Sequence, residues 1–267
     1  MNRAENALRT LTEMDDLAAQ RSFLHDVHPA AKLFSTIFYI VLVLSFHKYD
    51  LAGLIPLLLW PVLLFQLSGI PVRTCFYKLR IVLPLVLAVG LFEPFLDRTP
   101  LLYLGTLPVS GGVLSMLTLM LKGVFCLMAS FLLIATTPVD RFCAALRRLH
   151  VPGLLVTLFL LTYRYIGVLT EEVAVMTDAY HLRAPGQRGI HISAWGSFLG
   201  QLLLRSMDRA QRLYAAMLLR GYHEHFHYAQ QRAFRAGDLG FAAAGAAFCL
   251  LLRFLPLAQM LGGLFVR

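Results

Sequence analysis

The sequence predicts an all-α polytopic membrane protein, with about five spanning helices and a cytoplasmic insertion that holds two arginine-ended helices. Of the 267 residues, 58% are hydrophobic and 15% are charged, whereas a soluble domain carries about a quarter charged residues. The mean hydropathy is +0.67, and several uncharged apolar runs approach the roughly 20 residues that a helix needs to cross a bilayer. The net charge of +9 is typical of basic cytoplasmic loops, so nucleic acid is not indicated as a partner.

Four apolar runs in the first half of the chain are predicted to span the bilayer. Pro56 and Pro61 are expected to kink the second run, which membrane helices tolerate. The segment 97–110, after the third run, is expected to be a loop. The four runs cover residues 33–46, 51–67, 81–95 and 112–135.

The positions of Lys and Arg predict the orientation. The N-terminus, the 73–80 loop and the 140–150 segment are basic, so we expect them in the cytoplasm. A fifth apolar run, 152–173, contains Arg164, and an arginine at the centre of a lipid-facing helix costs at least about 2.5 kcal/mol. If this run crossed, the arginine-rich residues 174–235 would lie outside. We therefore expect 152–173 to lie at the inner membrane face, with its Tyr and Arg side chains at headgroup level.

These expectations divide the chain into four parts. The N-terminal lead-in has no apolar core typical of a signal peptide, so it is expected in the cytoplasm. The last span is expected over about 239–265, with Arg253 inside it. The parts are a cytoplasmic lead-in (1–32), a membrane domain with four spans (33–135), a cytoplasmic or interfacial domain (136–235) and a last membrane span (236–267).

A charged helix is predicted over residues 205–221. At about 100° per residue, its arginines fall on one stripe. Met207, Ala210, Tyr214, Met217 and Leu218 share the opposing face, of which Tyr214, Met217 and Leu218 are expected to pack against the chain's own scaffold. Gly221 is expected to end this helix as a C-cap glycine. The arginines of the stripe are Arg205, Arg209, Arg212 and Arg220.

A second helix, which begins near Val173, has the same pattern. It carries Ala179, ends in Arg183, and is expected to be stopped by Pro185 and Gly186. One arginine near a helix C-terminus is explained by the helix dipole, which it complements by about 0.3–1 kcal/mol. Two arginine-ended helices in one insertion favour docking to a protein, because an arginine side chain can form two hydrogen bonds to one carboxylate of a partner.

These residues carry a family resemblance. The stretch "DRAQRLYAAMLLRGY" (208–222) closely resembles the Ala-Arg-Gly-type coupling motif of the transmembrane T-component of energy-coupling factor transporters, with Leu219 in place of the motif's alanine. The nearest similarity is to the cobalt-type CbiQ family. "AYHLRAPG" resembles a looser first copy of the motif, and "DVHPAAKL" resembles the segment that leads into that family's first span.

The resemblance implies a transporter subunit of an ABC-type importer in the cell (inner) membrane, without its own ATPase site. Its partners would be two cytoplasmic ABC ATPase subunits and a membrane substrate-binding (S) subunit. The substrate would be a transition-metal ion, cobalt or alternatively nickel. The arginine-ended helices would be coupling helices, with Arg183 and Arg220 as anchors. The residues expected to couple to the ATPases are Arg183, Arg220, Ala179, Ala216, Gly221, Arg209 and Arg212.

Other candidate sites are weaker. "HEHFH" places His223, His225 and His227 at alternate positions, and imidazole binds cobalt, nickel and zinc, but a solvated loop is favoured here. No GxxxxGK[ST] loop occurs, so ATP binding is not expected, and no cofactor is indicated. The four cysteines form no CxxC pair and are expected to be packing residues.

Two rival functions remain open at this stage. An intramembrane metalloenzyme would use the histidines of "HEHFH" with Arg164. It would also need carboxylates at membrane depth, whereas Glu93 and Asp97 are expected near the outer face. A self-sufficient secondary transporter would usually contain internal repeats, and none is found among the spans.

Overall fold

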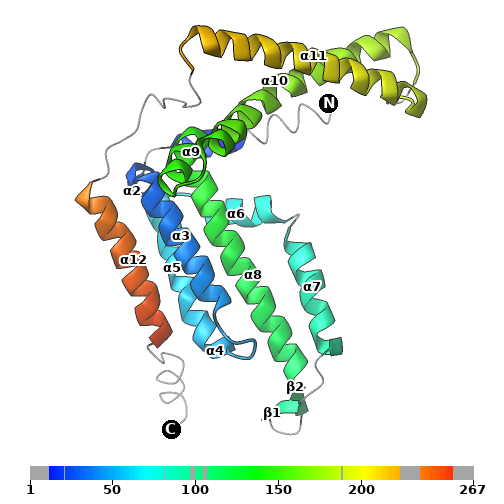
Figure 1. Ribbon diagram of the computed structural model, residues 1–267. Coiled ribbons are helices and arrows are strands. Elements are labelled where there is room, and N and C mark those ends of the chain that lie inside the picture. The colour runs from blue at the N-terminus through cyan, green and yellow to red at the C-terminus, as the bar shows by residue number, and fades with distance from the viewer. Residues whose placement is uncertain are drawn as a thin grey trace. The chain divides into compact units, whose positions relative to one another are not determined.

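The computed structural model describes residues 12–20, 22–80, 82–96, 100–104, 107–187, 189–222 and 235–254. These residues are mainly helical, which confirms the all-α class, apart from one short β-hairpin (Figure 1). The chain divides into two compact units, which are described separately. The first, called the membrane unit, comprises Ala18–Pro138 and Arg232–Arg267; the second, called the arginine unit, comprises Met1–Leu17 and Val139–Gln231.

The membrane unit contains the predicted spans, although residues 255–265 of the last one lie outside the described residues. Helices α8 and α12 are each long and apolar enough to cross a membrane, as is the η1–α5 segment when joined to α6, although that pair is bent by 111°. Helices α3 and α7 are shorter apolar helices. The elements are α2 (Phe23–Asp26), α3 (Pro29–Leu44), α4 (Leu51–Leu54), the 3₁₀ turn η1 (Ile55–Leu58), α5 (Leu59–Ser68), α6 (Val72–Leu79), α7 (Leu83–Leu96), α8 (Gly111–Thr136) and α12 (Ala236–Phe254).

Two local features differ from the sequence-based expectation. The segment 97–110 was expected to be a loop, but β1 (Pro100–Leu104) and β2 (Leu107–Ser110) form an antiparallel hairpin there. The pairing lets the backbone N–H and C=O groups of the two short strands bond to each other. The 73–80 segment was also expected to be a loop, but α6 (Val72–Leu79) is helical there. The expected kink at Pro56 is confirmed, because Pro56 lies in the 3₁₀ turn between α4 and α5.

The core of the membrane unit lies where α3, α5, α8 and α12 meet, and Figure 1 shows α3 between α8 and α12. Tyr39 on α3 is fully buried, and its hydroxyl donates a hydrogen bond to the Leu57 carbonyl at 3.1 Å. The Trp60 ring packs against Phe241 of α12. Gly245 permits this approach, because a Cβ there would lie 2.7 Å from the indole ring.

Polar contacts tie the ends of these helices together. The buried Lys32 ammonium donates to the Thr136 carbonyl at 2.8 Å, which joins α3 to the end of α8. The Asp238 carboxylate accepts from the His28 amide at 2.9 Å and from the Arg235 amide at 2.9 Å, which joins the starts of α12 and α3. Buried charges persist when they are hydrogen-bonded in this way.

The arginine unit contains the helices α9 (Val139–Arg148), α10 (Gly153–Arg183) and α11 (Ile192–Leu219). A small apolar cluster of Cys143, Val156 and Leu160 joins α9 to the first turns of α10. Separate helices were expected over 152–173 and up to Arg183. That expectation is wrong, because α10 is one continuous helix of 31 residues with no proline inside it. A helix of that length extends about 46 Å, and α10 is long and apolar enough to cross a membrane.

Candidate coupling site

The α10 helix ends because Pro185 restricts the backbone of the residue before it. Pro185 disfavours a helical conformation for the residue before it, and Ala184 accordingly has φ −126° and ψ 65°. Its amide still donates to the Tyr180 carbonyl at 3.0 Å, and Gly186 then turns the chain with φ +90°. The Tyr180 hydroxyl donates to Gln187 at 2.9 Å, which fixes the turn beside Arg183. The predicted stop after Arg183 is therefore confirmed.

The end of α11 is a Schellman cap. Gly221 has φ +79°, in the left-handed region that favours glycine. The Tyr222 amide donates to the Met217 carbonyl at 3.0 Å, and the Gly221 amide donates to the Leu218 carbonyl at 3.0 Å. These two bonds define the motif. The predicted C-cap is confirmed, and it leaves Arg220 as the C-cap residue of the helix.

Both helix ends present the same exposed dipeptide, Leu-Arg. Leu182 is 84% exposed and Leu219 is 90% exposed, and the arginine that follows each is also exposed. Single exposed leucines are common on proteins, but matched ones at two helix ends indicate a contact surface. The sequence interpretation missed Leu182, although the repeated Leu-Arg before a helix breaker was a readable signal.

The two alanines expected beside the arginines differ in environment. Ala179 is half-buried on α10, whereas Ala216 is exposed on α11. Because Ala216 is both small and exposed, a partner protein could approach the α11 backbone closely at this position.

The α11 helix buries only part of the face that was predicted to pack against the chain's own scaffold. Of Tyr214, Met217 and Leu218, which were expected to pack there, Tyr214 and Leu218 are 58% and 50% exposed, and only Met217 is half-buried. The half-buried side of α11 instead holds Arg209 and Leu213. The correction has a physical cause, because an acidic side chain on α10 pairs with the arginine stripe.

That acidic side chain is Glu172. Its carboxylate forms ion pairs with Arg205 and with Arg209, one turn apart on α11. The Arg209 Nη2 atom lies 3.3 Å from Glu172 Oε2. The Glu172 side chain is 19% exposed, so water screens these pairs less than fully exposed ones. Two of the predicted coupling residues therefore differ in setting: Arg209 holds α11 to α10, whereas Arg220 is exposed at a helix end.

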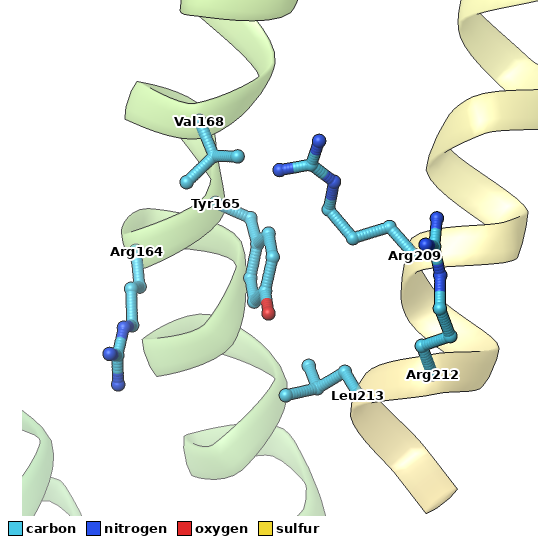
Figure 2. Close-up of a pocket in the computed structure, with 6 residues that line it drawn as sticks. All are labelled: Arg164, Tyr165, Val168, Arg209, Arg212 and Leu213. Carbon is cyan, nitrogen blue, oxygen red and sulfur yellow. The ribbon is translucent and has the colours of Figure 1, made fainter. Parts of the chain in front are cut away.

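A pocket of about 480 Å³ lies beside this contact, between α10 and α11. Figure 2 shows the Tyr165 ring in the middle, with Arg164 on one side and Arg209 and Arg212 on the other. Val168 and Leu213 complete the lining. The predicted coupling residue Arg212 thus lies in this pocket, and its Nε donates to the Asp208 carbonyl at 3.2 Å.

The described residues give no support for a metal site in this chain. The histidines at 223, 225 and 227 lie outside the described residues. Within the described ranges, no group of three or more His, Cys, Asp or Glu side chains is placed to hold a metal ion. Burial raises the pKa of the Cys143 thiol to about 11, with a smaller contribution from Asp140. A thiol with that pKa stays protonated at neutral pH, which is unfavourable for metal binding.

Comparison with known proteins decides the family. The family model CbiQ, described as "Cobalt transport protein", matches residues 20–229. The chain belongs to the CbiQ family. The match includes α10, the connection to α11 and the whole of α11, so both arginine-ended helices are part of the family's sequence pattern. With its apolar helices, this CbiQ-family chain is a multi-pass membrane protein of a transport family.

Two curated relatives share parts of the sequence. The "Cobalt transport protein CbiQ" of Rhodobacter capsulatus is 38% identical over 93 residues, which is 34% of this chain and 37% of the relative. The "Nickel permease LarQ" of Lactiplantibacillus plantarum is 32% identical over 91 residues, which is 34% of this chain and 33% of the relative. The alignments thus span only about a third of each of these relatives.

Proposed function

We propose that this CbiQ-family chain is the transmembrane T-component of an energy-coupling factor importer. It couples ATP hydrolysis by two cytoplasmic ABC ATPase subunits to uptake of a transition-metal ion by a membrane substrate-binding subunit. The proposed ion is cobalt, following the description of the family. Nickel is the alternative, because one relative is named a nickel permease.

The observation that carries the proposal is the placement of the two Leu-Arg ends. Arg183 ends α10 and is joined to the start of α11 by the short segment 184–191, whereas Arg220 lies at the far end of α11. The α11 helix has 28 residues. A helix of that length extends about 42 Å. Two arginine ends separated by the length of a helix can engage two different soluble subunits at the same time. This geometry supports a partner made of two ATPases better than a single docking site.

Each of the two helix ends presents side chains that can dock to another protein. An exposed leucine fills an apolar groove, and the adjacent arginine pairs with a carboxylate at the groove's edge. At the α11 end, the exposed Ala216 lets the groove close around the helix. We assign ATPase anchoring to Arg183 and Arg220, and we assign Arg209 and Arg212 to the α10–α11 crossing that holds the ends apart.

The proposed orientation places the N-terminus and the arginine unit in the cytoplasm. Although α10 is long enough to span a membrane, a full crossing would place α11 and its arginines outside, against the positive-inside rule. Exposed leucines occupy its first turns, and Tyr163, Arg164 and Tyr165 follow them. We therefore propose that α10 enters the inner leaflet at its start and leaves it near these aromatic residues.

Co-purification tests this function. The tagged chain is co-expressed with its genomically neighbouring ATPase and substrate-binding subunits, solubilised, and captured. The proposal expects both ATPases and the membrane subunit to be retained, and ATP-dependent ⁵⁷Co²⁺ uptake by vesicles that contain the complex. A chain that is captured alone, or that supports metal uptake without ATPases, would contradict it. Parallel uptake of ⁶³Ni²⁺ decides between the two metals.

A further inference from the structure

The pocket between α10 and α11 is lined by more arginines than there are carboxylates paired with them in the described part of the chain. It is lined by Arg164, Arg209 and Arg212. Arg209 is paired with Glu172. Within the described part of the chain, neither Arg164 nor Arg212 forms an ion pair. Two guanidinium groups thus line a pocket of about 480 Å³ with no described carboxylate paired to them.

The arrangement of the lining suits an anionic oxygen ligand. In Figure 2, Tyr165 lies between Arg164 on one side and the two arginines of α11 on the other. In Figure 2 the Arg209 side chain extends toward α10, whereas the Arg164 side chain points away from α11, so a change of the Arg164 rotamer is needed for a phosphate over Tyr165 to be bound from both helices. Arginine forks match phosphate oxygens in a bidentate way. Long arginine side chains can change rotamer to close on such a group, because no ion pair within the described residues fixes Arg164 or Arg212.

The α10 helix itself indicates where the phosphate comes from. Before the pocket, its first turns expose Leu154 (73%), Leu158 (62%) and Phe159 (47%). Tyr163 and Tyr165 follow, and tyrosine is enriched at the headgroup level of membranes. From Phe159 to Tyr165 the helix rises about 9 Å. The pocket therefore adjoins the exposed apolar first turns of α10, as the phosphate level of a membrane adjoins its acyl region.

We propose that the pocket lined by Arg164, Tyr165 and Arg212 is a binding site for the phosphate of an anionic phospholipid. The acyl chains run along the exposed apolar side of residues 154–161, and the headgroup phosphate sits over Tyr165. Arg209, held by Glu172, contributes a fixed positive edge. The site anchors the crossing of α10 and α11 at the membrane surface. The site rests on the membrane placement of α10 proposed above, but not on the proposed coupling to ATPases.

Native mass spectrometry of the full chain, purified alone, tests the site. The probes are phosphatidylglycerol, phosphatidylcholine and inorganic phosphate, each titrated separately, and inorganic phosphate is also added as a competitor of phosphatidylglycerol. We expect phosphatidylglycerol adducts to form well below the concentration needed for phosphatidylcholine. The double variant Arg164→Gln/Arg212→Gln should weaken phosphatidylglycerol binding about 30-fold, which corresponds to about 1 kcal/mol for each arginine removed.

Two further variants keep the outcome interpretable. Arg183→Gln/Arg220→Gln removes the same charge from the same unit but away from the pocket, and it should bind phosphatidylglycerol as the wild type does. Arg164→Lys/Arg212→Lys keeps the positive charge at both positions, and it should retain part of the phosphatidylglycerol binding. Partial binding by this variant shows that a substituted pocket still folds.

Three results would overturn the proposal. Competition by inorganic phosphate at similar concentration would assign the site to free phosphate and remove the lipid source. Equal losses in the pocket and helix-end variants would show that binding depends on net charge and not on this site. Unchanged lipid binding together with lost ATPase co-purification in the pocket variant would make the pocket a protein-docking surface.

Discussion

Replacing Glu172 with Gln should loosen the contact between α10 and α11. Its carboxylate pairs with Arg205 and Arg209, whose side chains are 48% and 38% exposed, while its own side chain is 19% exposed. Glutamine preserves the shape of the side chain but removes the charge. Both arginines would then face α10 without this ionised partner.

The size of the effect follows from the exposure of the three groups. Exposed ion pairs contribute about 0.2–1 kcal/mol each. Because the carboxylate is mostly shielded from water, the upper half of that range applies, and the two pairs together contribute about 1–2 kcal/mol. A change of that size shifts the equilibrium between the packed and separated helices by a factor of about 5 to 30.

Hydrogen–deuterium exchange of the solubilised chain measures this shift. Peptides that cover residues 200–212 should exchange faster in Glu172→Gln by that factor, and high salt should reduce the difference. Glu171→Gln is the matched control, because Glu171 is its exposed neighbour on α10. A double-mutant cycle with Arg209→Gln should return a coupling energy of at least about 0.5 kcal/mol. The reasoning fails if Glu172→Gln and Glu171→Gln exchange alike, or if the cycle is additive.

Three further predictions concern other parts of the chain. Gly221→Ala should destabilise the end of α11 by about 1–2 kcal/mol, because an alanine disfavours the left-handed backbone of the cap. Gly200→Ala, in the middle of α11 where a Cβ meets open space, should be neutral or stabilising; thermal unfolding of the solubilised variants compares the two, and equal effects would contradict the cap. Replacing the three histidines of 223–227 with Ala should leave most metal uptake intact; loss of uptake in a normally assembled complex would restore a metal-relay role. Cysteines introduced at 188 and 232, in a background without the four native cysteines, should resist a membrane-impermeant maleimide in intact cells; ready labelling of either would overturn the proposed orientation.

The helices of the membrane unit are largely predictable from sequence, because their signals are local. The run expected over 112–135 is α8, Gly111–Thr136, and the run expected over 81–95 is α7, Leu83–Leu96. The ends of α10 and α11 were also predictable, since Pro185 and Gly221 act within one turn of the backbone they stop. Local steric rules of this kind need no knowledge of the rest of the fold.

The parts that sequence could not predict depend on contacts between distant residues. Glu172 and Arg205 are 33 positions apart, and no pattern along the chain showed that they would pair. Without that pair, hydrophobicity alone turns Tyr214 and Leu218 inward, which is the wrong face of α11. The continuity of α10 was missed for another reason. Its polarity changes near Glu171, but polarity does not end a helix when no proline or capping residue is present.

We propose that the Leu-Arg ends of α10 and α11 transmit ATPase movements to the membrane. The most direct test is ATP-dependent ⁵⁷Co²⁺ uptake and ATPase retention for Arg183→Glu and Arg220→Glu, each reconstituted with the partner subunits. Arg141→Glu, at an exposed position on α9, is the matched charge-reversal control. Loss of one partner of a buried interfacial charge pair costs roughly 2–5 kcal/mol, so each helix-end variant should lose uptake and bind the ATPases at least about 30-fold more weakly, while Arg141→Glu behaves as the wild type. Full uptake with stoichiometric ATPases in both helix-end variants would contradict the account.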